Sequence, residues 1–178
     1  IAPRGLVILV NFADIAFETE KAEMDSMLVG ENYTRNYSYT YKGKTYKIQS
    51  QGSARQYFED ASFGQYNPQF DVVGPVTISK EHSYYGKNDS YGSDMYPDKM
   101  VSEACKLADT EFDVDFTLYD NNNDGKVDFV FVVYAGYGEA DGGASTTIWP
   151  HAWNLLAAGT QCKVDGKTVD LYACGNEL

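Results

Sequence analysis

The chain has 178 residues, of which 43% are hydrophobic and 15% aromatic, so we expect a packed core rather than disorder. The net charge is −12, from 26 acidic and 14 basic residues, which argues against a nucleic-acid partner because such a partner needs a basic face. No apolar run approaches the roughly 18 residues that a membrane span needs. We therefore expect no membrane span, and one domain over residues 1–178.

The N-terminal part of the chain predicts a buried strand followed by peripheral elements. Residues 6–12 (LVILVNF) are continuously apolar and β-branched, which is typical of a central strand buried on both faces. A short charged helix is expected over residues 20–28. The Tyr-rich residues 31–50 predict an exposed loop or a peripheral hairpin, with a turn at Lys42-Gly43.

Helix and strand signals continue to alternate after this segment. The next predicted elements are a helix over residues 54–61, a strand over residues 70–79, a surface loop over residues 81–92 and a helix over residues 96–110. Ser53 is the expected N-cap of the first helix. Gly74-Pro75 forces a bulge or a kink in the strand. Pro97 suits the first turn of the second helix.

The segment DNNNDGKVD, residues 120–128, has the residue types of a calcium-binding loop. The predicted ligands are the side chains of Asp120, Asn122, Asp124 and Asp128 and the backbone carbonyl of Lys126. Gly125 stands where such loops turn sharply. Phe131 replaces the bidentate Glu of a full EF-hand and belongs to an apolar run, so calcium is expected at the entrance of a strand. The alternative is a solvated turn capped by Asx hydrogen bonds.

The C-terminal part predicts further strands of the same sheet. They are a strand over residues 129–134, a hairpin over residues 163–170 and a strand over residues 169–173. The Gly-rich residues 135–145 lack a Walker pattern, so nucleotide binding is not expected. Cys162 and Cys174 flank the hairpin and could form a disulfide. Strands separated by helices indicate an α/β fold with a mixed sheet.

Four blocks in this order carry a resemblance to a known family. They are LVILVNFAD, GSARQYFEDASFGQYNPQFDVVGPV, DFTLYDNNNDGKVDFVFVVYAGYGE and IWPHAW. The chain resembles the immune-inhibitor-A-like family of secreted bacterial zinc metallopeptidases over most of its length. The resemblance implies a zincin-like catalytic domain whose sheet is mostly parallel, with flanking helices. It also implies protein or peptide substrates, a secreted or cell-surface location, and structural calcium at residues 120–128.

One feature of that family is missing from the sequence. The catalytic zinc of the family depends on an H-E-x-x-H helix, whereas this chain has two histidines, His82 and His151, and neither begins such a motif. We therefore expect the chain to be the upper, N-terminal part of a catalytic domain, with zinc bound in the remainder of that domain. The remainder is then a partner of this chain, and the chain alone is expected to be inactive.

The resemblance also implies a substrate-binding rim at the last strand. In zincins the strand before the zinc helix pairs with an extended substrate by main-chain hydrogen bonds. By resemblance, Ala173, Cys174, Gly175 and Asn176 are the candidates for this rim. The alternative is an ordinary edge strand or a disordered tail.

Other readings of single residues and of the whole chain stay open at this point. His151 is either a zinc ligand or catalytic acid, or a structural histidine between two aromatic residues. Glu139 and Asp141 are a catalytic carboxylate pair, solvated acids or ligands of a second calcium ion. The alternative function is a non-catalytic extracellular calcium-binding module that binds protein or glycan through Tyr-rich loops. A hydrolase that uses paired carboxylates is a third possibility.

Overall fold

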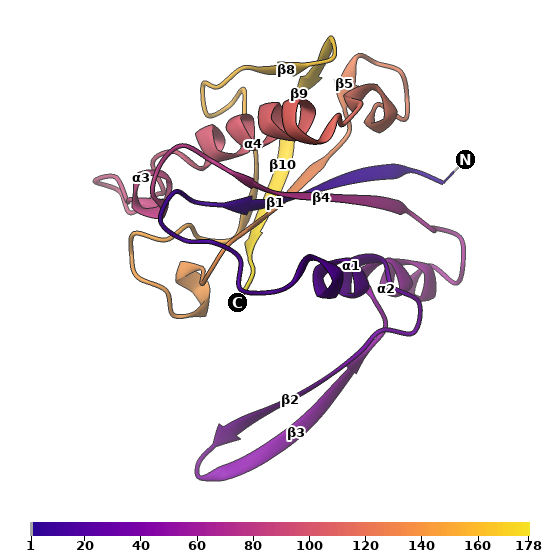
Figure 1. Ribbon diagram of the computed structural model, residues 1–178, viewed down its shortest axis with the longest axis vertical. Coiled ribbons are helices and arrows are strands. Elements are labelled where there is room, and N and C mark those ends of the chain that lie inside the picture. Colours follow the sequence, from indigo (N-terminus) through magenta and orange to yellow (C-terminus); the bar gives the residue numbers. More distant parts are fainter. Residues whose placement is uncertain (1) are drawn as a thin grey trace.

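The computed structural model describes residues 2–178, and its centre is a five-stranded mixed sheet (Figure 1). The strands, in spatial order, are β4 (Gln69–Thr77), β1 (Arg4–Asn11), β6 (Val130–Tyr134), β10 (Leu171–Asn176) and β7 (His151–Asn154). All neighbours pair in parallel except β10 and β7, which are antiparallel. The predicted α/β class, with a mixed and mostly parallel sheet, is confirmed.

Strand β1 contributes side chains to the two hydrophobic clusters, one on each face of the sheet. Its side chains alternate between the faces of the sheet, so Leu6, Ile8 and Val10 belong to one cluster and Val7 and Leu9 to the other. All five are buried. A run of apolar residues without polar alternation is what burial on both faces requires, which explains why the sequence alone identified this strand.

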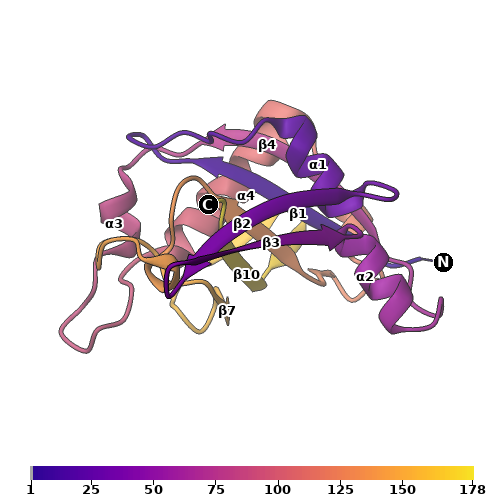
Figure 2. The same ribbon diagram turned by 90° about the horizontal axis from the view of Figure 1, so that it is seen from below.

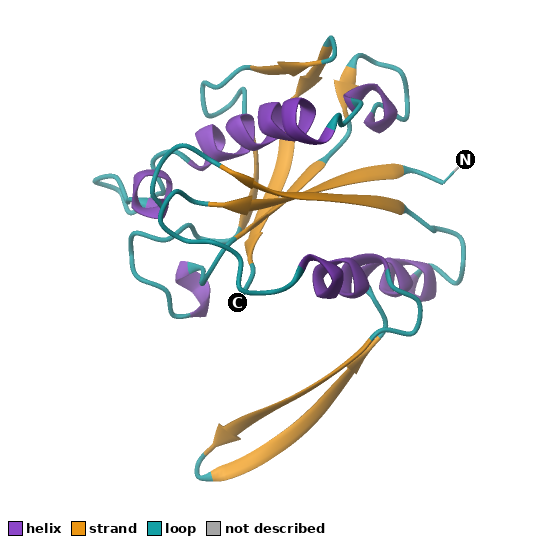
Figure 3. Cartoon of the chain, viewed as in Figure 1, coloured by secondary structure: helices purple, strands orange, loops and turns teal. Residues whose placement is uncertain are grey.

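Helices cover the two faces of the sheet unequally. Helix α4 (Pro97–Phe112) lies on one face and contributes Met100, Ala104, Cys105 and Ala108 to its core. Helices α1 (Lys21–Val29) and α2 (Ala54–Ala61) lie on the opposite side (Figure 3). Ser53 caps α2 as predicted: its hydroxyl accepts from the Gln56 amide at 3.3 Å, and Gln56 Oε1 accepts from the Ser53 amide at 3.1 Å.

The predicted irregularity at Gly74-Pro75 is a bulge against β1. The β1–β4 register shifts between Ile8 and Val10. Gly74 has a positive φ of 99°, and a Cβ there would lie 2.5 Å from the Leu9 carbonyl oxygen. Glycine is therefore required by both the backbone conformation and the close approach of the two strands.

The Tyr-rich segment is a hairpin that projects from the body of the molecule. Strands β2 (Thr34–Tyr41) and β3 (Lys44–Gln51) pair with each other alone and hang below α1 and α2 (Figures 1 and 2). Lys42 and Gly43 form the tip with φ values of 49° and 75°, which suits a tight hairpin turn. The hairpin alternative for residues 31–50 is thus the correct one.

The predicted surface loop after β4 needs correction. Residues 81–92 are not entirely a surface loop, because they contain the short helix α3 (His82–Gly86), in which Tyr85 and Gly86 are buried. The Tyr85 hydroxyl donates to Glu103 at 2.8 Å, which satisfies its polar end inside the protein. A Cβ on Gly86 would lie 2.5 Å from the Thr147 carbonyl carbon, so this helix packs closely against another loop.

Short elements complete the fold. They are the 3₁₀ turns η1 (Phe116–Tyr119) and η2 (Glu139–Asp141) and a small sheet of β5 (Lys126–Val127), β9 (Lys167–Val169) and β8 (Cys162–Val164). The predicted hairpin over residues 163–170 is confirmed by β8 and β9. No helix among residues 2–178 combines the length and apolar composition needed to cross a membrane.

The three cysteines are free and buried. Cys162 Sγ lies 3.9 Å from the Ser102 carbonyl oxygen on α4, whereas Cys174 Sγ lies 3.5 Å from His151 Nδ1 on β7. The suggested disulfide between Cys162 and Cys174 is therefore wrong in this structure.

Candidate functional site

The main sheet ends at β4 on one side and at β7, not β10, on the other. β10 lies between β6 and β7, so Ala173 pairs with both Phe131 and Ala152, and Cys174 pairs with both Val132 and His151. The last strand is therefore not an edge strand over Leu171–Cys174, contrary to the alternative considered for it. Main-chain pairing with a substrate is not open to Ala173 and Cys174, because both of their neighbouring strands are already present.

Gly175 and Asn176 differ from the two residues before them. They pair with Val133 and Tyr134 of β6, and the β7 register ends before them. The Gly-rich loop packs closely here, since a Cβ on Gly138 would lie 2.7 Å from Asn176 Oδ1. Glycine at position 138 is therefore explained by its close packing against the end of β10 and not by a ligand.

The free edge of β7 presents main-chain groups at alternate residues. The Leu155 amide donates to the Asp170 carbonyl at 2.9 Å, which fixes the side of the chain that faces the β10 segment. Groups two residues apart point the same way along a strand. Trp153 and His151 therefore direct their amides toward β10, and Ala152 and Asn154 direct theirs toward the open edge.

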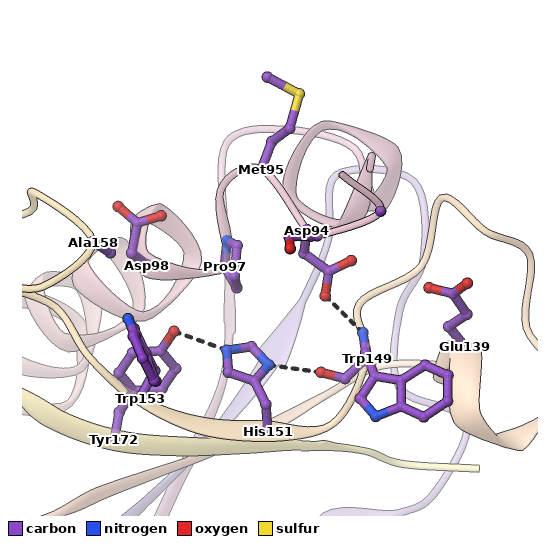
Figure 4. A pocket seen from close by; sticks show the side chains of 12 residues that line it. Asp94, Met95, Pro97, Asp98, Glu139, Trp149, His151, Trp153, Ala158 and Tyr172 are labelled. Atoms are coloured by element: carbon purple, nitrogen blue, oxygen red, sulfur yellow. Dashed lines mark hydrogen bonds between the residues drawn. The ribbon is translucent and has the colours of Figure 1, made fainter. Parts of the chain in front are cut away.

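A cavity of about 650 Å³ lies beside β7 on the α4 face of the sheet (Figure 4). Its walls combine aromatic and acidic side chains: Trp149, Trp153, Tyr172, Asp94, Asp98 and Glu139. These residues come from β7 and the loop before it, β10, η2, the start of α4 and the loop before that helix. The sequence offered no signal for this grouping, because its members are far apart along the chain.

His151 lies at the floor of this cavity with both ring nitrogens occupied. Nδ1 is 2.7 Å from the Trp149 carbonyl oxygen and Nε2 is 2.9 Å from the Tyr172 hydroxyl. A neutral ring with the proton on Nδ1 fits both contacts, since it donates to Trp149 and accepts from Tyr172. This arrangement supports the structural interpretation of His151 over the zinc-ligand one.

The other histidine and the suggested carboxylate pair lie in different surroundings. His82 Nδ1 contacts Asp14 Oδ2 at 2.6 Å at the start of α3. Burial would raise the pKa of Asp14, but its hydrogen bonds from His82 outweigh that effect and lower it. Glu139 lines the cavity, whereas its partner in the suggested pair, Asp141, does not.

The acidic groups of the cavity have little compensation from basic side chains. Asp94 Oδ2 accepts from the Trp149 amide at 2.8 Å, and burial raises the pKa of Asp94. Asp98 accepts from the Thr160 hydroxyl and lies 3.8 Å from Lys99 Nζ. Within the part of the chain that the structure describes, no hydrogen bond or ion pair holds the Glu139 carboxylate.

The loop of residues 120–128 curls around the Asp120 side chain. Its carboxylate accepts from the amides of Asp124 at 3.0 Å and Gly125 at 2.9 Å, and from Lys167 Nζ at 2.6 Å. The contact with Lys167 lowers the pKa of Asp120. Asp128 instead turns to Asn121, whose amide and side chain donate to it at 2.8 and 2.7 Å.

These contacts decide how well the predicted metal ligands fit calcium. Oxygen donors of the right type are present at Asp120, Asn122, Asp124 and Asp128, and Gly125 makes the turn with φ 88°. The acidic groups do not converge, however, and no cluster of three His, Cys, Asp or Glu side chains able to hold a metal occurs in residues 2–178. Calcium binding requires Lys167 to leave Asp120 and Asp128 to turn inward.

Comparison with known proteins agrees with the resemblance seen in the sequence. Residues 3–176 match the family described as immune inhibitor A peptidase M6, catalytic domain. "Immune inhibitor A" from Bacillus thuringiensis subsp. alesti is 28% identical over 187 aligned residues, which cover 89% of this chain. The aligned part covers 27% of that protein, so the chain spans about a quarter of this relative. Because the family match runs almost from end to end, the chain belongs to the immune inhibitor A peptidase family, M6.

Proposed function

We propose that this chain is the N-terminal part of the catalytic domain of a secreted zinc metallopeptidase, which hydrolyses peptide bonds in proteins. The supporting observation is the free edge of β7, an antiparallel strand at the border of a mostly parallel sheet, in a chain of the M6 family. We propose that this sheet is the upper subdomain of a zincin-like fold. The partners are then the protein substrate and the rest of the catalytic domain.

The role of this chain in the reaction is to align the substrate. An extended peptide beside β7 can exchange main-chain hydrogen bonds with Ala152 and Asn154, which gives affinity without dependence on sequence. Gly175 and Asn176 extend this rim beyond the end of β7. Ala173 and Cys174 do not pair with the substrate themselves but hold β7 in place by pairing with it. Main-chain pairing fixes the direction and register of the peptide before cleavage.

We propose that zinc is held outside the described part of this chain. His82 and His151 are engaged by different partners, and no third ligand accompanies either of them among residues 2–178. The residues present do not fit a catalytic zinc site, which needs three protein ligands. We therefore assign the zinc ligands to the remainder of the catalytic domain.

Calcium at residues 120–128 is proposed as a stabilising ion. The donor types and the turn at Gly125 favour it, and the Lys167 contact with Asp120 opposes it. A calcium ion here would fix η1 to β5 at the entrance of β6. Its role is structural, because the loop leads into β5 of the small sheet (Figure 1), whereas β7 belongs to the edge of the main sheet.

A non-catalytic extracellular binding module is the second candidate function. The exposed hairpin of β2 and β3 favours it, because Tyr37, Tyr39 and Tyr41 are each about half exposed. The two candidate functions differ in whether they need the main-chain amides at the free edge of β7. A binding module that uses its hairpin does not depend on the main-chain amides of the distant sheet edge.

The decisive experiment is an activity assay with the full-length protein and its Ala152→Pro variant. Proline removes the amide that points to the open edge but keeps the β7–β10 pairing. We expect casein cleavage to be zinc-dependent and kcat/KM to fall at least about tenfold in the variant, equivalent to about 1.4 kcal/mol. Asn36→Pro, in the projecting hairpin, is the control and should cleave normally. A full-length protein that is inert with zinc bound would refute the peptidase proposal.

A further inference from the structure

The cavity beside β7 has a chemistry of its own, and we propose that it is a subsite for a lysine or arginine side chain of the bound peptide. This inference rests on the proposed function and specifies it: the peptidase would prefer substrates with a basic residue at the position that faces the cavity. Three independent features support it: the position of the cavity beside β7, its negative charge and its aromatic walls.

The position follows from strand geometry. His151 and Trp153 are two residues apart on β7 and both line the cavity, so this face of the strand is the cavity face. A peptide paired with the free edge places alternate side chains on the same face. Those side chains lie about 5 Å from their β7 neighbours, measured between Cβ atoms, and so they reach the mouth of the cavity.

The charge of the cavity selects for a cation. Three carboxyl groups line it, and no lysine or arginine does. Asp94 has one oxygen on the Trp149 amide, and Glu139 has no polar partner in residues 2–178, so both keep oxygens available. Proximity to Glu139 also contributes, after burial, to the raised pKa of Asp94. A cation placed between these two groups relieves their repulsion.

Asp98 contributes less than the other two acids. Its Oδ2 atom accepts from the Thr160 hydroxyl, and Lys99 Nζ lies 3.8 Å away and partly balances its charge. The selective pair is therefore Asp94 and Glu139. In Figure 4, Asp94 points toward the main-chain amide of Trp149, and Glu139 stands beside the ring of Trp149.

The aromatic walls suit the remainder of a basic side chain. Trp149 and Trp153 are 54% and 56% exposed, so their rings are accessible to a side chain that enters the cavity. Lysine and arginine carry an apolar stem that packs along aromatic surface and a charged end that is attracted to the face of an indole ring. A small or acidic side chain gains neither contact.

The test uses the full-length protein and three fluorogenic peptides that differ at one position, which carries Lys, norleucine or Glu. Norleucine matches the lysine stem without its charge. A scan of that position along the peptide identifies the residue that faces the cavity. We expect kcat/KM to follow the order Lys, norleucine, Glu, with at least about a tenfold preference for Lys over norleucine. The preference should shrink as ionic strength rises.

Substitutions of the cavity carboxylates test whether the preference for Lys arises in the cavity. Asp94→Asn keeps an acceptor for the Trp149 amide and Glu139→Gln keeps the size of the side chain, so both remove charge with little change in shape. The double variant should lose the Lys preference, so that its kcat/KM for the Lys peptide falls to the value for the norleucine peptide. Asp141→Asn is the matched control: it removes a charge from the same 3₁₀ turn but does not line the cavity.

Each failure has a distinct meaning. Equal cleavage of all three peptides by the wild-type protein overturns the subsite, and so does a double variant that loses activity equally toward Lys and norleucine. If no peptide is cleaved, the peptidase proposal fails, and calorimetric binding of the same peptides to the full-length protein then decides about the cavity. Tighter binding of the Lys peptide, abolished in the double variant, supports the subsite; equal binding overturns it.

Discussion

The ammonium group of Lys167 lies 2.6 Å from Asp120 Oδ2, inside the loop that was expected to hold calcium. The Asp120 side chain is inaccessible to solvent, and Lys167 reaches it from β9, 47 positions away in the sequence. Lysine therefore supplies the positive charge that the loop needs. The ammonium group and a calcium ion compete for the same carboxylate.

Replacement of Lys167 by methionine should make the loop more dependent on calcium. In chelator, the Tm of Lys167→Met should fall below that of the wild type, because Asp120 keeps its charge but loses its partner. In calcium, the variant should recover that loss and bind the ion more tightly than the wild type. Scanning calorimetry with calcium or chelator measures both effects. Lys163→Met, which removes an exposed lysine from β8, is the control and should respond like the wild type.

A second substitution distinguishes stabilisation by calcium from stabilisation by the hydrogen bonds of the turn. Asp128→Asn keeps an acceptor for Asn121 but removes one negative charge, so it should abolish the gain from calcium with little effect in chelator. Asp120→Ala should instead destabilise the protein in both conditions, because the amides of Asp124 and Gly125 lose their acceptor. If calcium changes the Tm of neither the wild type nor Lys167→Met, the loop is a capped turn and the calcium proposal is wrong.

Local features of this fold were predictable from the sequence because their causes are local. The continuous apolar run of β1 requires burial on both faces, and Ser53 followed by Gln56 forms a capping box within four residues. The tip at Asp165-Gly166 needs positive φ at both positions, which this dipeptide adopts readily. Each signal lies within a few residues of the element that it specifies.

The candidate site was not predictable in the same way, because it depends on which strands become neighbours. β10 was expected at the edge, but β7 pairs with it from a segment some twenty residues earlier that carries little strand signal of its own. The cavity joins Asp94, Glu139 and Trp149 only after the sheet has formed. The Lys167–Asp120 contact likewise depends on the pairing of β5 with β9.

The projecting hairpin should contribute little to the stability of the body. Every residue of β2 is exposed, and the Gly52 amide donates to the Tyr33 carbonyl at 2.7 Å, so the two ends of the hairpin already meet. Replacement of residues 34–51 by a short Gly-Ser linker should therefore change the free energy of unfolding by less than about 1 kcal/mol. Urea denaturation measures this change. A loss of several kcal/mol would mean that the hairpin is part of the core, contrary to its exposure.

Burial should suppress the reactivity of Cys174. It raises the pKa of this thiol to about 12 from an ordinary value near 9. The thiolate population at pH 8 is then lower by about a thousandfold than for an ordinary cysteine. Because the folded state holds the proton more tightly, the group favours folding below about pH 9, and this contribution is lost as the pH rises toward 12. Mass spectrometry after alkylation measures the effect; equal labelling of native and urea-unfolded protein at pH 8 would contradict it.

Substitution of His151 tests whether its role is structural. Its ring links the Trp149 carbonyl on one side to the Tyr172 hydroxyl on the other, and Tyr172 is almost completely buried. His151→Ala leaves both groups without this partner and should cost about 1–3 kcal/mol of stability. His151→Asn should recover part of that loss, because its amide can still donate to the Trp149 carbonyl. In the full-length protein, both variants should retain the wild-type zinc content, measured by atomic absorption. Stoichiometric loss of zinc from a folded His151→Asn variant would instead make His151 a ligand, and the assignment of every zinc ligand to the remainder of the domain would then be wrong.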